Sequence, residues 1–308
     1  DVVGSVELQG SRTTDAYFGA FSMFHKANRV VEIRGNRDGA DDAGALTFHT
    51  MPTGGSITER LRIDSAGNAG LGVSPKSWYS GFTAMQLSDT GAIWCENIGG
   101  ESSMAIGENS YLATDGAYKY LTTDEASSYI QSNGIHSFKV AVSGTADAAI
   151  TWTDALTIDS AGNVTLPAQP AFNVNLSTSQ NDIATGAWTT VLFNNERFDQ
   201  GSNFNTGTYT FTAPVTGKYQ LDVSLRLENV DAAAGYYEVR IATSNKDYKW
   251  LFDPRGLGSD PDYWPVSLSV LADMDTSDTS TVDIYQYGGT AQTDVNADQA
   301  AFSGFLAC

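Results

Sequence analysis

Hydrophobic and polar residues alternate at every second position in many short stretches of this chain, whereas no long stretch shows a helical repeat. Alternation of this kind is typical of β-strands that bury one face. In the first half, the predicted strands are short and are separated by Gly, Asn, Asp and Ser, which favour turns. They cover residues 29–34, 45–48, 91–94, 118–121 and 136–140.

In the second half, the alternating stretches become longer and follow one another at intervals of roughly ten residues. This spacing is typical of a β-sandwich or jelly roll, and the length of the segment suits a single domain of that kind. We therefore predict a sandwich domain over residues 168–308. Its predicted strands cover residues 209–214, 217–225, 236–241, 266–270, 281–287 and 301–306.

One phrase occurs twice, as LRIDSAGN at residues 61–68 and as LTIDSAGN at residues 156–163. The apolar residues on either side of position 62 predict a short strand with one buried face. Asp-Ser-Ala-Gly-Asn then predicts a turn, because Asp and Ser cap the backbone and Gly tolerates a positive φ angle. Pro75 and Pro167 mark the ends of the two units. Each copy is therefore predicted to be a hairpin that closes a β-rich module.

These hairpins divide the first half into module 1, residues 1–75, and module 2, residues 76–167. None of the predicted strands there carries enough apolar surface to form a deep core alone. Thin, turn-rich modules of this kind usually become stable by packing against copies of themselves. The expected fold is all-β, with an intertwined oligomeric shaft followed by a β-sandwich jelly-roll head at residues 168–308.

The net charge of −19 argues against binding to nucleic acid, whose phosphates require a cationic surface. An anionic membrane surface is disfavoured for the same reason, and no apolar run is long enough to cross a bilayer. The two cysteines, Cys95 and Cys308, lie in no metal-binding spacing and are expected to be free thiols. The chain begins at Asp1 without a recognisable signal peptide. We expect it to be a fragment or a processed product whose attachment region lies upstream.

The first half resembles bacteriophage tail-fibre proteins, which carry similar phrases at the ends of their shaft modules. The resemblance is carried by residues 59–68 followed by Gly-Leu-Gly-Val-Ser-Pro at 70–75, and by the text at 35–44 and 77–79. The second copy departs from the pattern, because Val-Thr-Leu at 164–166 lacks the Gly-apolar-Gly ending. We interpret that departure as the junction between shaft and head.

The second half resembles the jelly-roll head of the complement/TNF type, which implies a homotrimer that serves recognition and not catalysis. The residues that carry this resemblance are 170–174, 188–191, 193–199, 204–207, 209–214, 217–219 and 302–306.

Together the two resemblances imply the distal part of a phage tail fibre, located in the virion. Such a homotrimeric adhesin binds a host cell-surface polysaccharide or outer-membrane component and attaches upstream to tail or baseplate proteins. Three heads presented together gain avidity from modest individual contacts. No enzymatic activity, nucleic-acid partner or membrane insertion is expected. Two alternatives stay open: a tailspike-type polysaccharide hydrolase, which would need an acid pair beside the glycosidic bond, and a purely structural fibre segment.

The loop at residues 250–265 is the candidate receptor site, because it combines aromatic residues, Asp and Arg among Pro and Gly. Aromatic faces stack on sugar rings, and Asp and Arg hydrogen-bond to hydroxyl groups. Packing of Trp250, Phe252 and Trp264 in a trimer interface is the alternative. The expected receptor contacts are Arg255, Asp260, Asp262, Tyr263 and Trp264.

Neither a catalytic residue nor a cofactor is predicted, although a structural calcium ion is left open. Two acidic loops, at 38–42 and 273–278, offer oxygen ligands but match no complete calcium-binding pattern. The histidines His25, His49 and His136 are scattered, without the spacing of a metal site, and are expected to be structural.

Overall fold

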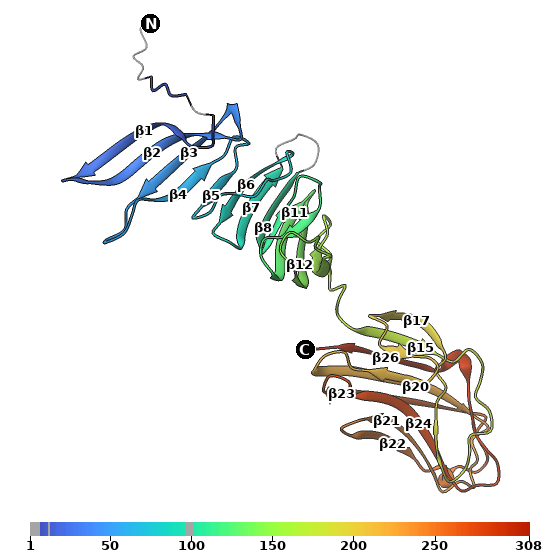
Figure 1. The fold of residues 1–308 in the computed structure, drawn as a ribbon. Helices are drawn as coiled ribbons and strands as arrows, with labels where there is room; N and C mark the ends of the chain where they lie inside the picture. Colours follow the sequence, from blue (N-terminus) through green and yellow to red (C-terminus); the bar gives the residue numbers. More distant parts are fainter. Residues whose placement is uncertain (1–6, 12, 97–101) are drawn as a thin grey trace. The chain divides into compact units, whose positions relative to one another are not determined.

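The computed structural model describes residues 7–11, 13–96 and 102–308. The chain forms two compact units, Asp1–Pro167 and Ala168–Cys308, which we call the shaft unit and the head. Apart from the short 3-10 helices η1 (Pro254–Gly256) and η2 (Ala297–Gln299), regular structure among the described residues is β (Figure 1). The predicted all-β fold is confirmed.

In the described part of the shaft unit, twelve strands form one sheet in the order β1-β2-β3-β4-β5-β6-β7-β8-β11-β12-β13-β14. Neighbouring strands are antiparallel except β5 and β6, which run parallel. Strands β9 and β10 pair separately. The strands are β1 (Tyr17–His25), β2 (Asn28–Asp38), β3 (Ala40–Thr50), β4 (Thr58–Ile63), β5 (Ala69–Leu71), β6 (Phe82–Leu87), β7 (Gly91–Glu96), β8 (Ser103–Glu108), β9 (Ser110–Leu112), β10 (Tyr118–Tyr120), β11 (Asp124–Ser132), β12 (Ile135–Gly144), β13 (Thr153–Ile158) and β14 (Val164–Thr165).

The repeated phrase forms two hairpins, as predicted. In the first, Oδ1 of Asp64 accepts hydrogen bonds from the backbone N–H groups of Ala66 (3.0 Å) and Asn68 (2.8 Å). Gly67 adopts φ +86°, which a side chain would strain. Asp159 makes the same two bonds at 2.9 Å in the second copy. The aspartate therefore fixes each turn through the local backbone.

The two hairpins differ in their surroundings. Asn68 is buried, and its Oδ1 accepts a hydrogen bond from the backbone N–H of Ala84 in β6 (3.0 Å). The corresponding Asn163 is exposed, because β14 ends the sheet. The parallel pairing of β5 with β6 carries the sheet past Pro75, so the two predicted modules share one continuous sheet.

Module 2 contains an aromatic core that the sequence did not lead us to expect. The ring centroids of Trp78 and Trp94 lie 5.4 Å apart, and Tyr111 packs edge-on to Trp78 at 6.0 Å. Tyr111 lies in β9, outside the large sheet, and packs against the small residues Ala92 and Ala105 of β7 and β8. Small side chains on the sheet leave room for these large rings.

The head is a sandwich of two antiparallel sheets. The first head sheet has the order β17-β15-β26-β20-β23, and the second β18-β19-β24-β21-β22; β25 and β16 pair at the sides of β20 and β24. After β19 the chain crosses repeatedly between the sheets, which is the jelly-roll arrangement (Figure 1). The predicted jelly-roll sandwich is confirmed. Its strands are β15 (Ala171–Asn175), β16 (Trp188–Thr190), β17 (Asn195–Gln200), β18 (Phe204–Asn205), β19 (Thr210–Thr212), β20 (Gly217–Glu228), β21 (Tyr236–Thr243), β22 (Asp247–Phe252), β23 (Tyr263–Met274), β24 (Thr279–Tyr287), β25 (Asp294–Val295) and β26 (Ala301–Leu306).

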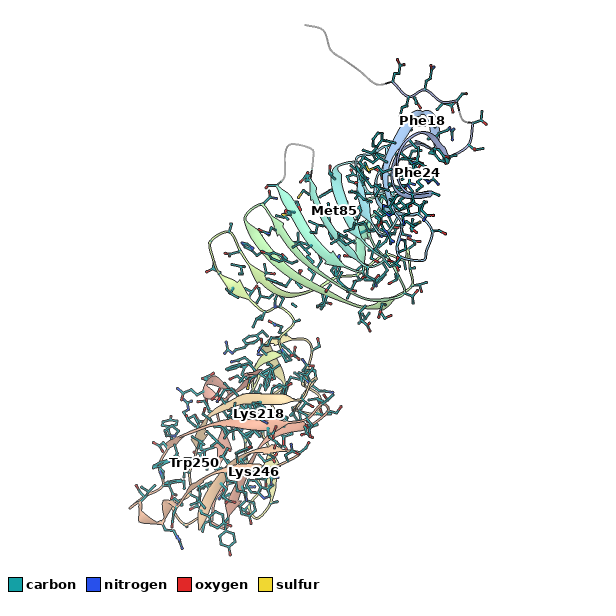
Figure 2. The ribbon with its side chains drawn as sticks, turned by 90° about the vertical axis from the view of Figure 1, so that its left-hand side faces the viewer. Phe18, Phe24, Met85, Lys218, Lys246 and Trp250 are labelled. Carbon is teal, nitrogen blue, oxygen red and sulfur yellow. The ribbon has the colours of Figure 1, made fainter. Side chains whose placement is uncertain are left out.

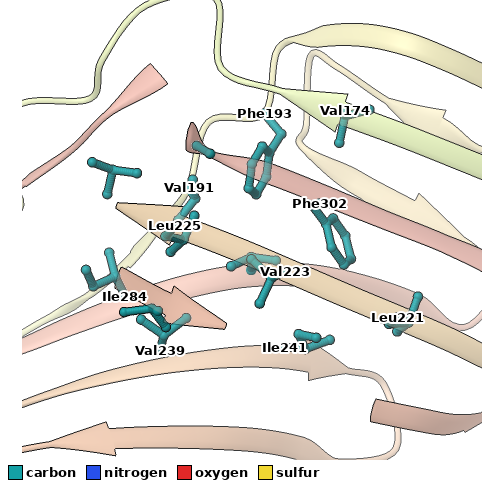
Figure 3. Packing of buried hydrophobic residues seen from close by; sticks show 14 of the residues in the cluster. Val174, Val191, Phe193, Leu221, Val223, Leu225, Val239, Ile241, Ile284 and Phe302 are labelled. Carbon is teal, nitrogen blue, oxygen red and sulfur yellow. The ribbon is translucent and has the colours of Figure 1, made fainter. Parts of the chain in front are cut away.

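The head has its own deep core between the two sheets. Every second residue of β20 points inward, as the alternation predicts. Figure 3 shows Leu221, Val223 and Leu225 of this strand facing Val239 and side chains of the opposite sheet. Aromatic rings fill the same space. All members of this core come from a single head.

Candidate self-association and recognition surfaces

The strand register of the shaft unit places large apolar side chains on one face of the twelve-stranded sheet. Directly paired residues of neighbouring strands project to the same face. Met85 pairs with Ile93, and Ile93 pairs with Ile106. Ile106 then pairs with Tyr129, which pairs with Phe138. We call this side the apolar shaft face. Its exposed large members among the described residues include Phe21, Met23, Leu46, Ile63, Leu71, Met85, Met104, Ile106, Phe138, Val140 and Val164.

The apolar shaft face is uncovered in the single chain. Met85, labelled in Figure 2, keeps 44% of its surface exposed, and Ile106 keeps 49%. Residues on the other side of the same strands, such as Ala84 and Ala105, are almost completely buried. The sequence predicted one buried face for β4, yet Ile63 on that face is exposed. Exposed apolar side chains gathered on one face make it a candidate interaction surface.

Charged residues gather on the opposite face of the sheet, where they pair with one another. Glu32 is buried and accepts hydrogen bonds from Arg34 (2.6 Å) and Ser22 (2.9 Å). Burial raises the pKa of Glu32, but these hydrogen bonds and the nearby arginine outweigh it, so the pKa lies below its ordinary value. Farther along, Lys139 pairs with Asp154. The ion pairs therefore leave the apolar shaft face free of their charge.

Two of the three histidines have local partners. Nε2 of His49 lies 2.9 Å from the hydroxyl of Thr47, and burial lowers its pKa. His136 stacks on Tyr129, with Nδ1 2.6 Å from the phenol oxygen. Within the described ranges, no group of three His, Cys, Asp or Glu side chains is placed to hold a metal ion.

The two predicted acidic loops use their carboxylates for local contacts. Asp41 pairs with Arg37 at 2.8 Å. Oδ2 of Asp278 accepts hydrogen bonds from the backbone N–H of Asp275 and from the side chain of Asn245, both at 2.8 Å. These carboxylates cap turns and pair with cations of the same chain.

The predicted receptor loop places its charged residues against near neighbours. Arg255 donates two side-chain hydrogen bonds to Asp253, at 2.9 and 2.6 Å. These bonds lower the pKa of Asp253 to about 2. Oδ1 of Asp260 accepts a hydrogen bond from the backbone N–H of Ala232 (2.8 Å), which ties the loop to a neighbouring turn.

The remaining predicted residues of this loop face in different directions. Trp264 stacks on Phe252 with ring centroids 3.9 Å apart, so this tryptophan packs within a single head. Tyr263 is 61% exposed, and the guanidinium of Arg226 lies 5.1 Å from its ring centroid. Asp262 is exposed, and its backbone carbonyl accepts a bond from an adjacent turn. Receptor binding by these residues stays a prediction.

Sequence reasoning missed a second aromatic group on the head. Trp188, Tyr236, Tyr285 and Tyr287 lie on the outer face of the second head sheet, and we call them the aromatic row. Ring centroids are 5.3 Å apart for Trp188 and Tyr285, 6.0 Å for Tyr285 and Tyr236, and 4.9 Å for Tyr236 and Tyr287. The signal was present, because Tyr285 and Tyr287 occupy outward positions of a strand predicted at 281–287.

Two polar pockets accompany these surfaces. One in the shaft unit, of about 520 Å³, is lined by Arg37, Asp38, Arg62 and Trp78 among others. Asp38 there accepts a hydrogen bond from a backbone N–H at 2.8 Å, and Arg62 is paired with a glutamate at 3.0 Å. One in the head, of about 600 Å³, is lined mainly by Asn, Thr and Ser. The carboxylates that line the shaft pocket, Asp15, Asp38 and Asp64, each accept a hydrogen bond from an arginine or a backbone N–H.

Cys95 and Cys308 are exposed free thiols that belong to different units. Among the residues that the structure describes, no helix is long and apolar enough to cross a membrane.

Comparison with known proteins gives matches to solved structures only. No family model matches the chain, and no curated protein sequence matches it. The globular domain of zebrafish complement 1qA protein is 21% identical to this chain and gives a TM-score of 0.35. That match covers 46% of this chain and 98% of the complement domain. Murine APRIL at pH 8.0 is 10% identical and gives a TM-score of 0.34, and the match covers 45% of this chain and 98% of the APRIL chain. The strand order given above, and not these similarities, defines the head as a jelly roll.

Proposed function

We propose that this chain is the distal part of a bacteriophage tail fibre, a homotrimeric adhesin that binds a host cell-surface polysaccharide or outer-membrane component. The proposal places the protein in the virion, attached through tail or baseplate proteins. The observation that carries it is the apolar shaft face, which a single chain leaves uncovered. The head forms a separate unit with its own core between two sheets.

The area of the apolar shaft face suits association between copies of the chain. The eleven exposed large side chains named above keep 38–60% of their surfaces uncovered. At roughly 60 Å² each, they offer on the order of 700 Å² per chain. A stable protein interface buries about 800 Å² per partner. Copies related by a closed rotation would each bury this face against their neighbours, and three copies is the number that the sequence resemblances imply.

Binding is favoured over hydrolysis by the state of the carboxylates. A glycosidase needs one carboxyl group as general acid and a second as base or nucleophile, both facing the substrate. Asp38 and Asp64 line the shaft pocket, but both accept backbone hydrogen bonds at 2.8–3.0 Å. Their geometry is that of turn caps, which hold the local backbone.

The test is binding of the fluorescently labelled full chain to a panel of whole bacteria, with unlabelled chain as competitor. Saturable binding that the competitor displaces supports the adhesin. A trimer that binds no strain would favour a structural fibre segment. Release of reducing sugars from the cell envelope would favour the hydrolase and contradict the proposal.

A further inference from the structure

The aromatic row is separate from the core of the head. Successive residues of β21 and β24 point to opposite sides of the sheet. Tyr237 and Ile284 point inward and are fully buried, whereas Tyr236 and Tyr285 point outward and are half-buried. Tyr287, at the end of β24, is 53% exposed. The row therefore exposes aromatic surface that the folding of the head does not require.

The rings of the row are held in place by their surroundings. The backbone N–H of Gly235 donates a hydrogen bond to the backbone carbonyl of Tyr287 (2.7 Å), and a Cβ atom at Gly235 would lie 2.6 Å from Cδ1 of the Tyr287 ring. At the other end, the guanidinium of Arg240 lies 4.1 Å from the ring centroid of Trp188. Asp283 holds this guanidinium at 2.9 Å. Rings fixed before binding lose little conformational entropy when a ligand arrives.

The row also carries hydrogen-bonding groups without partners. Among the described residues, the hydroxyl groups of Tyr236, Tyr285 and Tyr287 make no hydrogen bond to protein. Burial, together with the neighbouring phenols and Glu238, raises the pKa of Tyr236, so this phenol is neutral and donates at physiological pH. Three adjacent phenols thus combine apolar ring surface with free donors and acceptors.

The charges around the row are nearly balanced. Arg240 pairs with Asp247 as well as with Asp283, and Lys249 lies 3.8 Å from Glu238. Since these cations are matched by carboxylates, the surface does not attract a polyanion. An uncharged ligand rich in hydroxyl and C–H groups fits it best.

The row ends beside the loop at 250–265. The segment that precedes Tyr236 contacts both of them: Gly235 bonds to Tyr287 in the row, and Ala232 bonds to Asp260 in the loop. A chain-like ligand lying along the row therefore reaches this loop at its end.

We propose that the aromatic row binds a neutral polysaccharide, with ring surfaces against sugar C–H groups and the phenol hydroxyls hydrogen-bonded to sugar hydroxyls. The inference rests on the proposed adhesin function and names its ligand class and binding surface. It adds to the loop predicted from sequence a surface that lies on rigid strands.

The test applies the full chain to an array of neutral and anionic glycans, with solution titration of each retained glycan. Retention of neutral glycans is expected. Tyr236→Ser and Tyr287→Ser should each weaken binding at least about tenfold, because each removes one aromatic contact and one hydrogen bond. Tyr287→Phe keeps the ring and should weaken it less. Tyr79→Ser in the shaft unit, where Tyr79 is 39% exposed, is the control and should leave binding unchanged.

Retention of anionic glycans alone, retention of no glycan, or unchanged binding by both serine variants would each overturn the inference. The mass of every variant is measured in parallel. A serine variant that dissociates into folded single chains would assign the row to contact between copies and also overturn it. If the unmodified chain is a trimer but retains no glycan, only this inference is contradicted. If the unmodified chain is a folded monomer, the proposed function is contradicted.

Discussion

Substituting Met85 with aspartate should dissociate the proposed trimer without unfolding the head. Met85 lies in β6, in the middle of the apolar shaft face, and is 44% exposed in the single chain. Burying the rest of a methionine is worth about 1 kcal/mol, so three chains lose about 3 kcal/mol. Three carboxylates buried without partners cost at least about 2 kcal/mol each. The combined loss is on the order of 10 kcal/mol per trimer.

A loss of this size is easily measured. Since about 1.4 kcal/mol changes an equilibrium constant tenfold, the trimer association constant falls by about seven powers of ten. The concentration at half-dissociation varies as the inverse square root of that association constant, so it rises more than a thousandfold. Sedimentation equilibrium over a dilution series gives this concentration, and circular dichroism reports whether the head stays folded.

Val215→Asp is the matched control. Val215 is also 44% exposed but lies in the turn between β19 and β20 of the head. Its substitution should leave the mass unchanged. If Met85→Asp associates as the unmodified chain does, or if both substitutions dissociate it equally, the apolar shaft face is not the contact between copies.

Two further predictions concern buried polar groups. Asn68→Ala should destabilise the shaft unit by about 1–3 kcal/mol, since it leaves the buried N–H of Ala84 unpaired. Asn163→Ala, at the exposed counterpart, should lower the free energy of unfolding in urea clearly less. Equal losses for the two variants would contradict this reasoning. Buried Asp231 accepts hydrogen bonds from the backbone N–H groups of Ala233 (2.7 Å), Thr290 and Ala291. Asp231→Asn should therefore lower the melting temperature of the head. Although burial raises the pKa of Asp231, these hydrogen bonds outweigh it and hold the folded-state pKa below the unfolded value. The stability that Asp231 contributes is therefore present above about pH 4 and is lost as the pH falls through the folded-state pKa. Stability of the Asn variant should vary less with pH between 5 and 3; equal slopes would refute this assignment.

Local pattern was enough to predict most strands, both hairpins and the sandwich. Alternation reports that one face of a strand is apolar, and the repeated Asp-Ser-Ala-Gly-Asn specifies a turn through bonds within five residues. The alternation does not report what covers the apolar face of a strand. For β4, the face containing Leu61 and Ile63 is the one that a single chain leaves open.

Local sequence patterns could not predict which side chains from different elements of the fold contact one another. The packing of Tyr111 near Trp78 and Trp94 depends on a segment outside the large sheet. The stacking of Trp264 on Phe252 removes one predicted receptor residue from full exposure. In each case the side chain's partner lies on another element of the fold, and its identity depends on the three-dimensional arrangement.

The most direct test of the account is the absolute mass of the full chain, measured by light scattering after size-exclusion chromatography. We expect a stable particle of three chains, because the apolar shaft face is uncovered in a single chain. A well-folded single chain across the micromolar range would contradict self-association through that face and with it the fibre architecture.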